Sequence, residues 1–225
     1  MSNNNLTSKL LAEGIGTFAL VLFLVGALMS GGSIAAFAPA ILGLTVMVMV
    51  YSFGPISGGH FNPAITLAVC MTCKGCYKEM AFYWIAQIIG AVCAVYVLKF
   101  LMPTATTLGL TMPAATLADS TAVIWEAIAT FFVCFTAIVM LGEKSNNSFA
   151  GLAIGTALMI GMIFAAPAGG SLNPARSIGP ALVAGETMKL WIYIAGPFLG
   201  AIAAGFVHRQ LSTGEWGKGS CSTSR

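Results

Sequence analysis

Apolar segments about as long as a lipid bilayer is thick recur along this chain, and they restrict its fold more than any other feature. Crossing a bilayer core takes about 20 residues of helix. Charged residues make up only 8% of the sequence, whereas a soluble domain carries roughly 25% because water must solvate its surface. The sequence therefore predicts an all-α integral membrane protein. Six transmembrane helices are expected, at about 10–29, 37–53, 80–101, 121–141, 150–166 and 190–207.

Two further apolar pieces are too short to cross the membrane. Each begins at an Asn-Pro-Ala motif and runs for about ten residues, or roughly 15 Å of helix, which is half of a bilayer core. Asn is a preferred helix cap and Pro is favoured in the first turn. Broken helices at membrane depth are tolerated only where they line a cavity. The pattern predicts two re-entrant half-helices around a pore, starting at Asn62, Pro63, Ala64 and at Asn173, Pro174, Ala175.

The two halves of the chain match each other. Glu13 and Thr17 have the same spacing as Glu126 and Thr130, and each half carries one Asn-Pro-Ala motif. Three spans is an odd number, so the second half is expected to insert with the opposite topology. We therefore expect one domain over residues 1–225. It consists of inverted repeats at about 9–101 and 121–209 and a flexible cytoplasmic tail at 212–225.

The distribution of Lys and Arg orients the chain, because positively charged loops stay cytoplasmic. With the N-terminus inside, seven basic residues are cytoplasmic and three are not, counting Arg176 in the second re-entrant loop. Both termini are therefore expected in the cytoplasm, and the cell (plasma) membrane is the expected location. The net charge of +3 is too weak and too scattered to predict a nucleic-acid partner.

Cysteines form one run that needs separate consideration. Cys70, Cys73 and Cys76 have a Cys-x-x-Cys-x-x-Cys spacing, which suits a metal if a further ligand is near. No His-rich tract accompanies them, so small residues at a helix end explain the run better. We expect no metal and no cofactor. The sequence also has no visible nucleophile–base pairing or phosphate-binding loop, and it does not predict an enzyme.

Two loops resemble the signature loops of the aquaporin (major intrinsic protein) family. Their sequences are Ser-Gly-Gly-His-Phe-Asn-Pro-Ala at 57–64 and Ser-Leu-Asn-Pro-Ala-Arg-Ser at 171–177. The resemblance extends over about 9–209. It implies a homotetramer in the lipid bilayer, with one pore per subunit. It also implies a passive channel for water and small neutral solutes such as glycerol, which excludes protons and ions.

The physics of two facing half-helices agrees with such a channel. Each helix N-terminus carries about half a positive charge, so two of them meeting at the midplane repel cations and hydronium. The carboxamides of Asn62 and Asn173 are expected to donate hydrogen bonds to a passing oxygen. For one motif alone, helix capping is an equally good explanation of the Asn. The duplication favours the pore.

Arg176 lies three residues after Asn173 and therefore at membrane depth. An unpaired Arg there costs roughly 2.5–3.5 kcal/mol on insertion scales, so it is expected to face a water-filled cavity. The resemblance implies that it is the arginine of a narrow outer filter. Extension of its side chain to the outer headgroups is the alternative.

Three further titratable residues lie inside the predicted pore region. Glu13 and Glu126 are compatible with proton coupling, but their symmetric placement favours a structural role that the resemblance also implies, in which each accepts hydrogen bonds from the backbone of its re-entrant loop. His60 resembles the family's histidine at the cytoplasmic mouth. It is equally compatible with a hydrogen-bonding loop residue.

By resemblance, three more residues complete the outer filter. Counting from Gly43 gives Leu42, where water-selective members usually have an aromatic residue, and Gly170 is the second-loop position. The remaining position is Gly161 if counted from Asn173 but Met162 if counted from Pro167. We favour Met162, on the view that the second loop is one residue shorter than the first.

Leu42 and Met162 predict a filter wider and more apolar than that of a water-only channel. Ser177, however, follows Arg176 where glycerol-passing members usually have Asp. We therefore expect water permeability with some permeability to small neutral solutes. Two other functions remain open. One is an ion- or proton-coupled transporter, since these also use inverted repeats and broken helices. The other is a structural membrane protein with a vestigial pore.

Overall fold

The computed structural model describes residues 5–72, 77–105, 107–142 and 147–212, and in this part of the chain the regular structure is entirely helical. The α-helices are α1 (Leu6–Ser30), α2 (Gly32–Ala36), α3 (Ala38–Ser57), α4 (Pro63–Cys70), α5 (Tyr77–Leu101), α6 (Asp119–Leu141), α7 (Ala150–Phe164), α8 (Pro174–Ala184) and α9 (Ile192–Leu211). Two 3₁₀ turns, η1 (Asn147–Phe149) and η2 (Ala166–Ala168), precede and follow α7.

Five helices, α1, α3, α5, α6 and α9, are long and apolar enough to cross a membrane. The fifth predicted span is shorter than expected, because α7 has 15 residues and ends at Phe164. Other boundaries also differ from the prediction, among them the ends of α3 at Ser57 and of α9 at Leu211, each four residues later than expected. Helix α1 begins four residues earlier, at Leu6, and α5 begins at Tyr77, so that Glu79 lies in its first turn. There Glu79 forms an ion pair with Lys9 of α1 at 3.1 Å.

The end of α7 explains why the two halves of the chain lose their register. In the first repeat α3 continues as α-helix through Pro55 to Ser57, whereas in the second repeat the corresponding stretch is the 3₁₀ turn η2. A 3₁₀ helix rises about 2.0 Å per residue and an α-helix about 1.5 Å, so three residues of one span as far as four of the other. The loops that follow, from Gly58 and from Gly169, have the same length. The expectation of a shorter second loop was therefore wrong, since the missing residue lies in the helix end.

The helices of the two repeats interlock. Helix α1 packs against α3 and α5, α6 packs against α7 and α9, and α3 packs against α7. Gly43 of α3 and Gly155 of α7 face each other so closely that a Cβ added at Gly43 would lie 2.6 Å from the Gly155 carbonyl oxygen. The half-helix α4 contacts α6 and α9 of the other repeat, and α8 contacts α5. Each half-helix is therefore enclosed partly by the opposite repeat.

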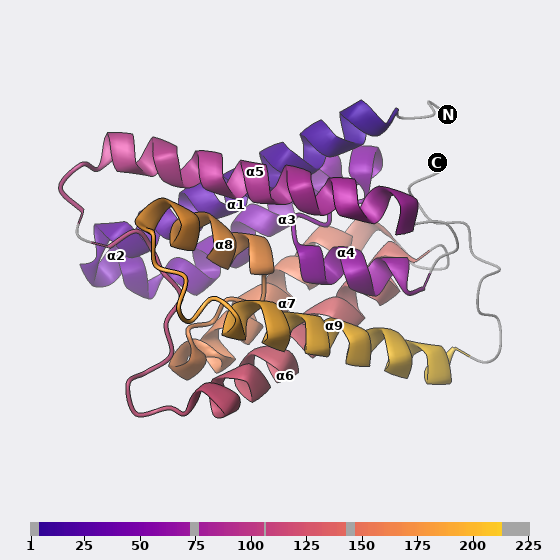
Figure 1. The fold of residues 1–225 in the computed structure, drawn as a ribbon. Helices are drawn as coiled ribbons and strands as arrows, with labels where there is room; N and C mark the ends of the chain where they lie inside the picture. The colour runs from indigo at the N-terminus through magenta and orange to yellow at the C-terminus, as the bar shows by residue number, and fades with distance from the viewer. Residues whose placement is uncertain (1–4, 73–76, 106, 143–146, 213–225) are drawn as a thin grey trace.

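The half-helices α4 and α8 lie end to end across the middle of the bundle (Figure 1). The same view shows that α1 begins and α9 ends on the same side of the molecule. That arrangement is what an even number of membrane crossings requires.

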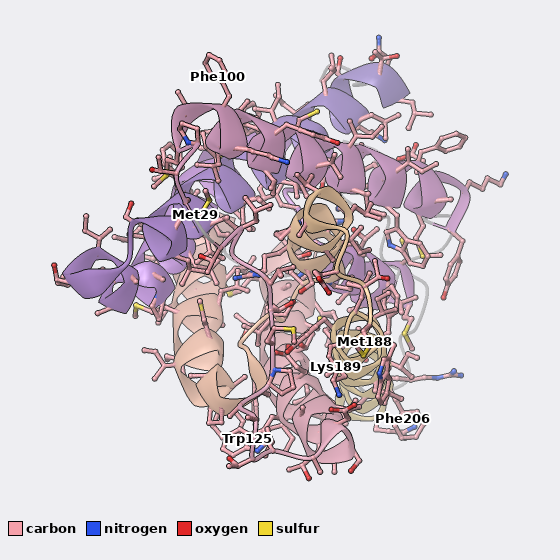
Figure 2. All side chains as sticks on the ribbon, turned by 60° about the vertical axis from the view of Figure 1, so that its left-hand side comes forward. Met29, Phe100, Trp125, Met188, Lys189 and Phe206 are labelled. Carbon is pink, nitrogen blue, oxygen red and sulfur yellow. The ribbon has the colours of Figure 1, made fainter. Side chains whose placement is uncertain are left out.

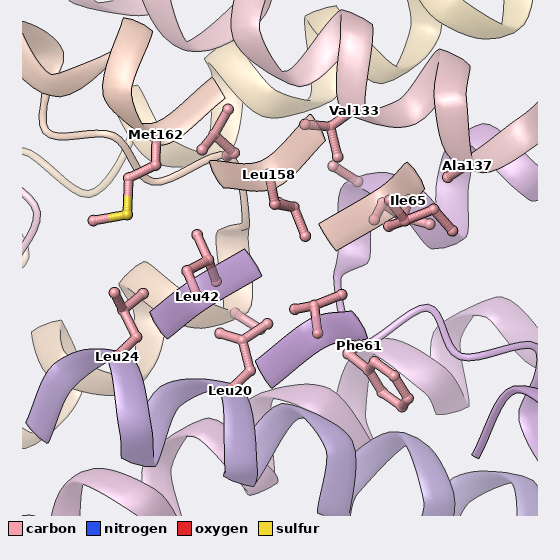
Figure 3. Close-up of a cluster of buried hydrophobic side chains, with 14 of the residues drawn as sticks. Leu20, Leu24, Leu42, Phe61, Ile65, Val133, Ala137, Leu158 and Met162 are labelled. Carbon is pink, nitrogen blue, oxygen red and sulfur yellow. The ribbon is translucent and has the colours of Figure 1, made fainter. Parts of the chain in front are cut away.

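Large apolar side chains cover the outside as well as the inside. Phe100 and Phe206 project outward from α5 and α9 (Figure 2) and are 84% and 59% exposed. Leu20, Leu42 and Leu158 belong to a buried cluster between α1, α3 and α7 (Figure 3). A bundle that is apolar on both faces is solvated by lipid. The protein is an integral, multi-pass membrane protein.

Some of the predictions lie outside the described residues. Cys73, Cys76 and residues 213–225 of the tail belong to this group. Cys70, the first cysteine of the run, is buried at the end of α4. Within the described ranges, no group of three His, Cys, Asp or Glu side chains is placed to hold a metal ion.

Candidate functional site

The two Asn-Pro-Ala motifs meet at the centre of the bundle and are joined by a reciprocal pair of hydrogen bonds. The side-chain oxygen of Asn62 caps α4 by accepting from the Ala64 N–H at 2.8 Å, and its Nδ2 donates to the Leu172 carbonyl at 2.8 Å. Asn173 caps α8 in the same way, and its Nδ2 donates to the Phe61 carbonyl at 3.0 Å. A carboxamide nitrogen carries two protons. Each Asn therefore keeps one N–H for another acceptor.

The residue before each motif Asn has a left-handed backbone. Phe61 has φ 50° and Leu172 has φ 56°, a conformation that costs a non-glycine residue about 1–2 kcal/mol. Both peptide groups are held from two sides. Each N–H donates to a buried carboxylate, Glu13 or Glu126, and each carbonyl accepts from the opposite Asn. These bonds offset the strain and turn both carbonyls toward the other half of the molecule.

Glu13 organises the first re-entrant loop. Its carboxylate accepts from the N–H groups of His60 at 2.9 Å and Phe61 at 2.7 Å, from Ser57 Oγ at 2.7 Å and from Gln87 Nε2 at 2.8 Å. The side chain is fully buried. Both of its oxygens are thus occupied by groups of its own repeat.

Glu126 takes the matching position in the second repeat. Its two oxygens accept from the N–H groups of Ser171 at 2.7 Å and Leu172 at 2.8 Å. Tyr193 adds a bond from its hydroxyl to the Ala168 carbonyl at 2.7 Å. Tyr83 makes the same bond to Ser57 in the first repeat, at 2.8 Å.

His60 is a buried, hydrogen-bonded loop residue. Its Nδ1 lies 3.2 Å from Thr66 Oγ1, and its ring packs against Tyr83 with the centroids 5.4 Å apart. Gln87 Nε2 also donates to Thr66 Oγ1, at 3.0 Å. His60, Thr66, Gln87 and Glu13 therefore form one connected polar cluster under the first motif.

Arg176 is completely enclosed, with 1% of its surface exposed. One guanidinium nitrogen, Nη1, donates to the Gly109 carbonyl at 2.8 Å. Its Nε has no hydrogen-bond partner within the described residues. The side chain is held inside the bundle rather than extended to the surface, and it keeps donor capacity for a further acceptor.

Comparison with known proteins agrees with this geometry. The family model described as Major intrinsic protein matches residues 1–208. The chain belongs to the major intrinsic protein family. It is 39% identical over 211 residues to a protein named Aquaporin NIP2-1 from Oryza sativa subsp. japonica, covering 91% of this chain and 70% of that protein.

Other major intrinsic proteins give similar matches. A Zea mays protein, also named Aquaporin NIP2-1, is 39% identical over 214 residues, covering 92% of this chain and 72% of that one. Among solved structures, the X-ray structure of the aquaglyceroporin from Plasmodium falciparum superposes with a TM-score of 0.79 at 19% identity. It covers 93% of this chain and 98% of that chain. The superposition shows a shared fold.

The structure of this major intrinsic protein brings three of the four predicted filter residues, Leu42, Met162 and Gly170, toward one region. Leu42 and Met162 extend from α3 and α7 toward the same interior space (Figure 3). A Cβ added at Gly170 would lie 3.2 Å from Met162 Cγ, so these two residues are neighbours. Gly161 instead faces Leu172 of the second loop, 2.9 Å from where its Cβ would be. Of the two candidates, Met162 is the one beside Gly170.

Among the residues that contact the site and that sequence reasoning missed, three are instructive. Gln87 was detectable, because an amide inside an apolar span is costly without a partner. Gly109 and Thr111 gave no such signal. They lie in the loop between the repeats, where neither a motif nor periodicity distinguishes them, and they reach the site only through the folded path of that loop.

Proposed function

We propose that this protein is a passive channel that conducts water and small neutral solutes such as glycerol and excludes protons and ions. The observation that carries the proposal is the reciprocal bonding of the two motif asparagines. This bonding holds the N-termini of α4 and α8 facing each other. One N–H of each Asn side chain remains available to a permeant molecule. The names of the relatives, aquaporins and an aquaglyceroporin, point the same way.

In the proposed mechanism, the dipoles of the two half-helices and a small number of hydrogen-bond donors select the molecules that pass. The facing helix ends concentrate about one elementary charge at the midplane, half from each helix, which opposes cations. A water oxygen that accepts from both Asn62 and Asn173 turns its protons away from its neighbours and interrupts a proton relay. The free donors of Arg176 bind the oxygen of a permeant. Apolar side chains such as Leu20 and Leu42 hold the molecule only weakly, so that it can leave.

Stopped-flow light scattering on proteoliposomes tests the proposal. An impermeant osmolyte reports water flux, and a glycerol gradient reports re-swelling. We expect both rates to exceed those of empty liposomes. Rates equal to those of empty liposomes with both osmolytes contradict the channel.

The filter assignment has its own test. The double change Leu42→Phe and Met162→His adds bulk and a hydrogen-bonding group to the filter. We expect glycerol flux to drop by about tenfold while water flux is retained. A narrower filter excludes glycerol by its size, and glycerol also loses its contacts with the apolar side chains. Undiminished glycerol flux shows that these two residues do not line the filter.

A coupled transporter is the competing function. It needs a carboxylate that exchanges protons, whereas both oxygens of Glu13 and of Glu126 already accept hydrogen bonds from their loops. This supports a structural role for Glu13 and Glu126, in which each holds the backbone of its re-entrant loop. Flux measured with and without a pH or sodium gradient separates the two functions, and gradient-driven accumulation of glycerol favours the transporter.

The same proposal includes the organisation of the protein in the membrane. Residues 1–225 form one channel domain of two inverted repeats. Both termini lie in the cytoplasm. The protein is a homotetramer in the plasma membrane. The supporting observations are the interlocked repeats and the shared side of the α1 start and the α9 end. Mass measurement of the detergent-solubilised protein tests the tetramer, and protease protection of a terminal tag tests the orientation.

A further inference from the structure

The loop that connects the two repeats, residues 102–118, touches the outer half of the site at several points. It is named the connecting loop here. The Gly109 carbonyl accepts from Arg176, and the Ala114 N–H donates to the Pro167 carbonyl at 2.9 Å. Between these two points, the hydroxyl of Thr111 donates to Ser177 Oγ at 2.8 Å. Thr111 is 6% exposed although it lies in a loop.

The Thr111 hydroxyl begins a chain of hydrogen bonds that ends at the second motif. Thr111 donates to Ser177 Oγ, and Ser177 Oγ lies 2.6 Å from Ser171 Oγ, a contact in which either hydroxyl can donate. Ser171 Oγ also lies within donating distance of the Asn173 carbonyl, at 3.0 Å. The chain therefore runs from Thr111 through Ser177 and Ser171 to the backbone of Asn173.

This chain ties the connecting loop to the same turn of α8 that carries the filter arginine. Ser177 follows Arg176 directly, and Thr111 lies two residues after Gly109, so two loop residues close in sequence hold two adjacent residues of α8. The backbone of Gly109 has φ 66°, and an added Cβ would lie 2.6 Å from Val25 Cγ1. The loop is therefore pressed against α1 at the point where its carbonyl meets Arg176.

We propose that Thr111 is a positioning residue for the filter, and that through Ser177 and Gly109 it fixes the guanidinium of Arg176. Without the Thr111 hydroxyl, the loop loses its central attachment and the Gly109 carbonyl is no longer held opposite Arg176. The arginine then moves, and the outer constriction widens. The inference rests on the proposed channel function, and it makes the connecting loop a determinant of selectivity.

Substitution of Thr111 by Val keeps the shape of the side chain and removes the hydroxyl. We expect the ratio of glycerol to water permeability in proteoliposomes to rise by about threefold or more, because small displacements of positioning groups have large effects. Thr111→Ser keeps the hydroxyl and should restore the wild-type ratio. Thr116→Val is the matched control, an exposed threonine of the same loop. A general loss of folded protein lowers both fluxes together and leaves the ratio unchanged.

Ser177→Ala breaks the same chain from the other end. Its effect on the ratio should resemble that of Thr111→Val, and the double variant should add little, since both act through one network. A ratio in Thr111→Val equal to that of Thr116→Val overturns the proposal.

Hydrogen exchange of the connecting loop tests the attachment without any flux. In Thr111→Val, amides of the loop peptide that contains Ala114 should exchange about tenfold faster than in wild type, as expected when a local contact opens more often. Thr116→Val should leave them unchanged. Unchanged exchange in Thr111→Val overturns the attachment itself. A wild-type protein that passes neither water nor glycerol contradicts the proposed function, whereas the exchange result still judges the attachment.

Discussion

In both re-entrant loops, the residue two positions before the motif asparagine is hydrogen-bonded to the residue four positions after it. In the first loop these residues are His60 and Thr66, and in the second they are Ser171 and Ser177. A third group joins each pair from outside the loop. In the first repeat it is Gln87 of α5, and in the second it is Thr111 of the connecting loop.

The third group shows where the two halves differ. Four residues after Tyr83, α5 carries Gln87, whereas four residues after Tyr193, α9 carries Pro197, which has no donor. The first loop is thus supported by a helix of its own repeat. In the second loop, the group that joins the pair comes from a segment that belongs to neither repeat. The backbone of a duplicated loop is fixed by the repeat, whereas the side chains that hold it in place can come from elsewhere.

The largest expected effect comes from the two glutamates. Glu13→Ala removes the carboxylate that accepts from four buried donors, including the N–H groups of two loop residues, at about 1–3 kcal/mol for each donor that is left unpaired. Glu126→Ala mainly removes the acceptor of backbone N–H groups, and it should lower the stability of the protein less. Yield of monodisperse protein and its thermal midpoint in detergent measure both. Exposed Glu186→Ala is the control, and a Glu126 variant less stable than the Glu13 variant would break the ranking.

The motif asparagines should respond alike, because their bonds are symmetric. In Asn62→Asp the carboxylate cannot donate to the Leu172 carbonyl, and it adds a negative charge where the two helix ends meet. Cation leak, followed by a pH-sensitive or potential-sensitive dye in proteoliposomes, should rise about tenfold. Asn173→Asp should match it. A leak in only one variant shows that the midplane is less symmetric than the bonding pattern.

The loop glycines offer a finer comparison. Gly59 and Gly170 have φ 68° and 60°, and alanine at either position costs about 1–2 kcal/mol in the left-handed region. Only at Gly170 does the new Cβ meet Met162, at 3.0 Å from its carbonyl oxygen. Gly170→Ala should therefore lower glycerol flux by about threefold relative to Gly59→Ala. Equal fluxes would remove Gly170 from the filter.

The smallest effect is expected for Gln87→Leu. The change removes the bonds to Glu13 and Thr66, but it also removes the Gln87 side-chain oxygen, which has no partner within the described residues. The two terms partly cancel, so we expect a loss of about 1 kcal/mol in the free energy of unfolding. Thermal midpoints in detergent give the measurement. A loss as large as that of Glu13→Ala would mean that Gln87 is the main support of the first loop.

Much of this arrangement follows from the sequence, for physical reasons that differ between residues. The spans are predictable because lipid demands apolar helices. The half-helices are predictable because Asn62 and Asn173 begin segments too short to cross. The carboxylates of Glu13 and Glu126 stand out because such groups are costly at membrane depth.

Other features depend on the folded path of the chain. The Gly161 or Met162 ambiguity arises because counting residues assumes the same rise per residue, and η2 does not have the rise of an α-helix. Thr111 is one of several threonines in a loop without periodicity. Only the path of that loop over α8 distinguishes it from the exposed Thr116.

The hydrogen bonds between the two asparagine motifs can form only after both halves of the chain have been synthesised. They connect residues 110 and 112 positions apart in the chain. At about 5–20 residues per second, a ribosome needs roughly 5–20 seconds after making Asn62 to supply the carbonyl that its amide will bind. During that interval the half-helix α4 of the nascent chain lacks the hydrogen bonds that the second half later makes to its N-terminal end. The Asn62 amide gains its acceptor only after the chain has been made as far as Leu172.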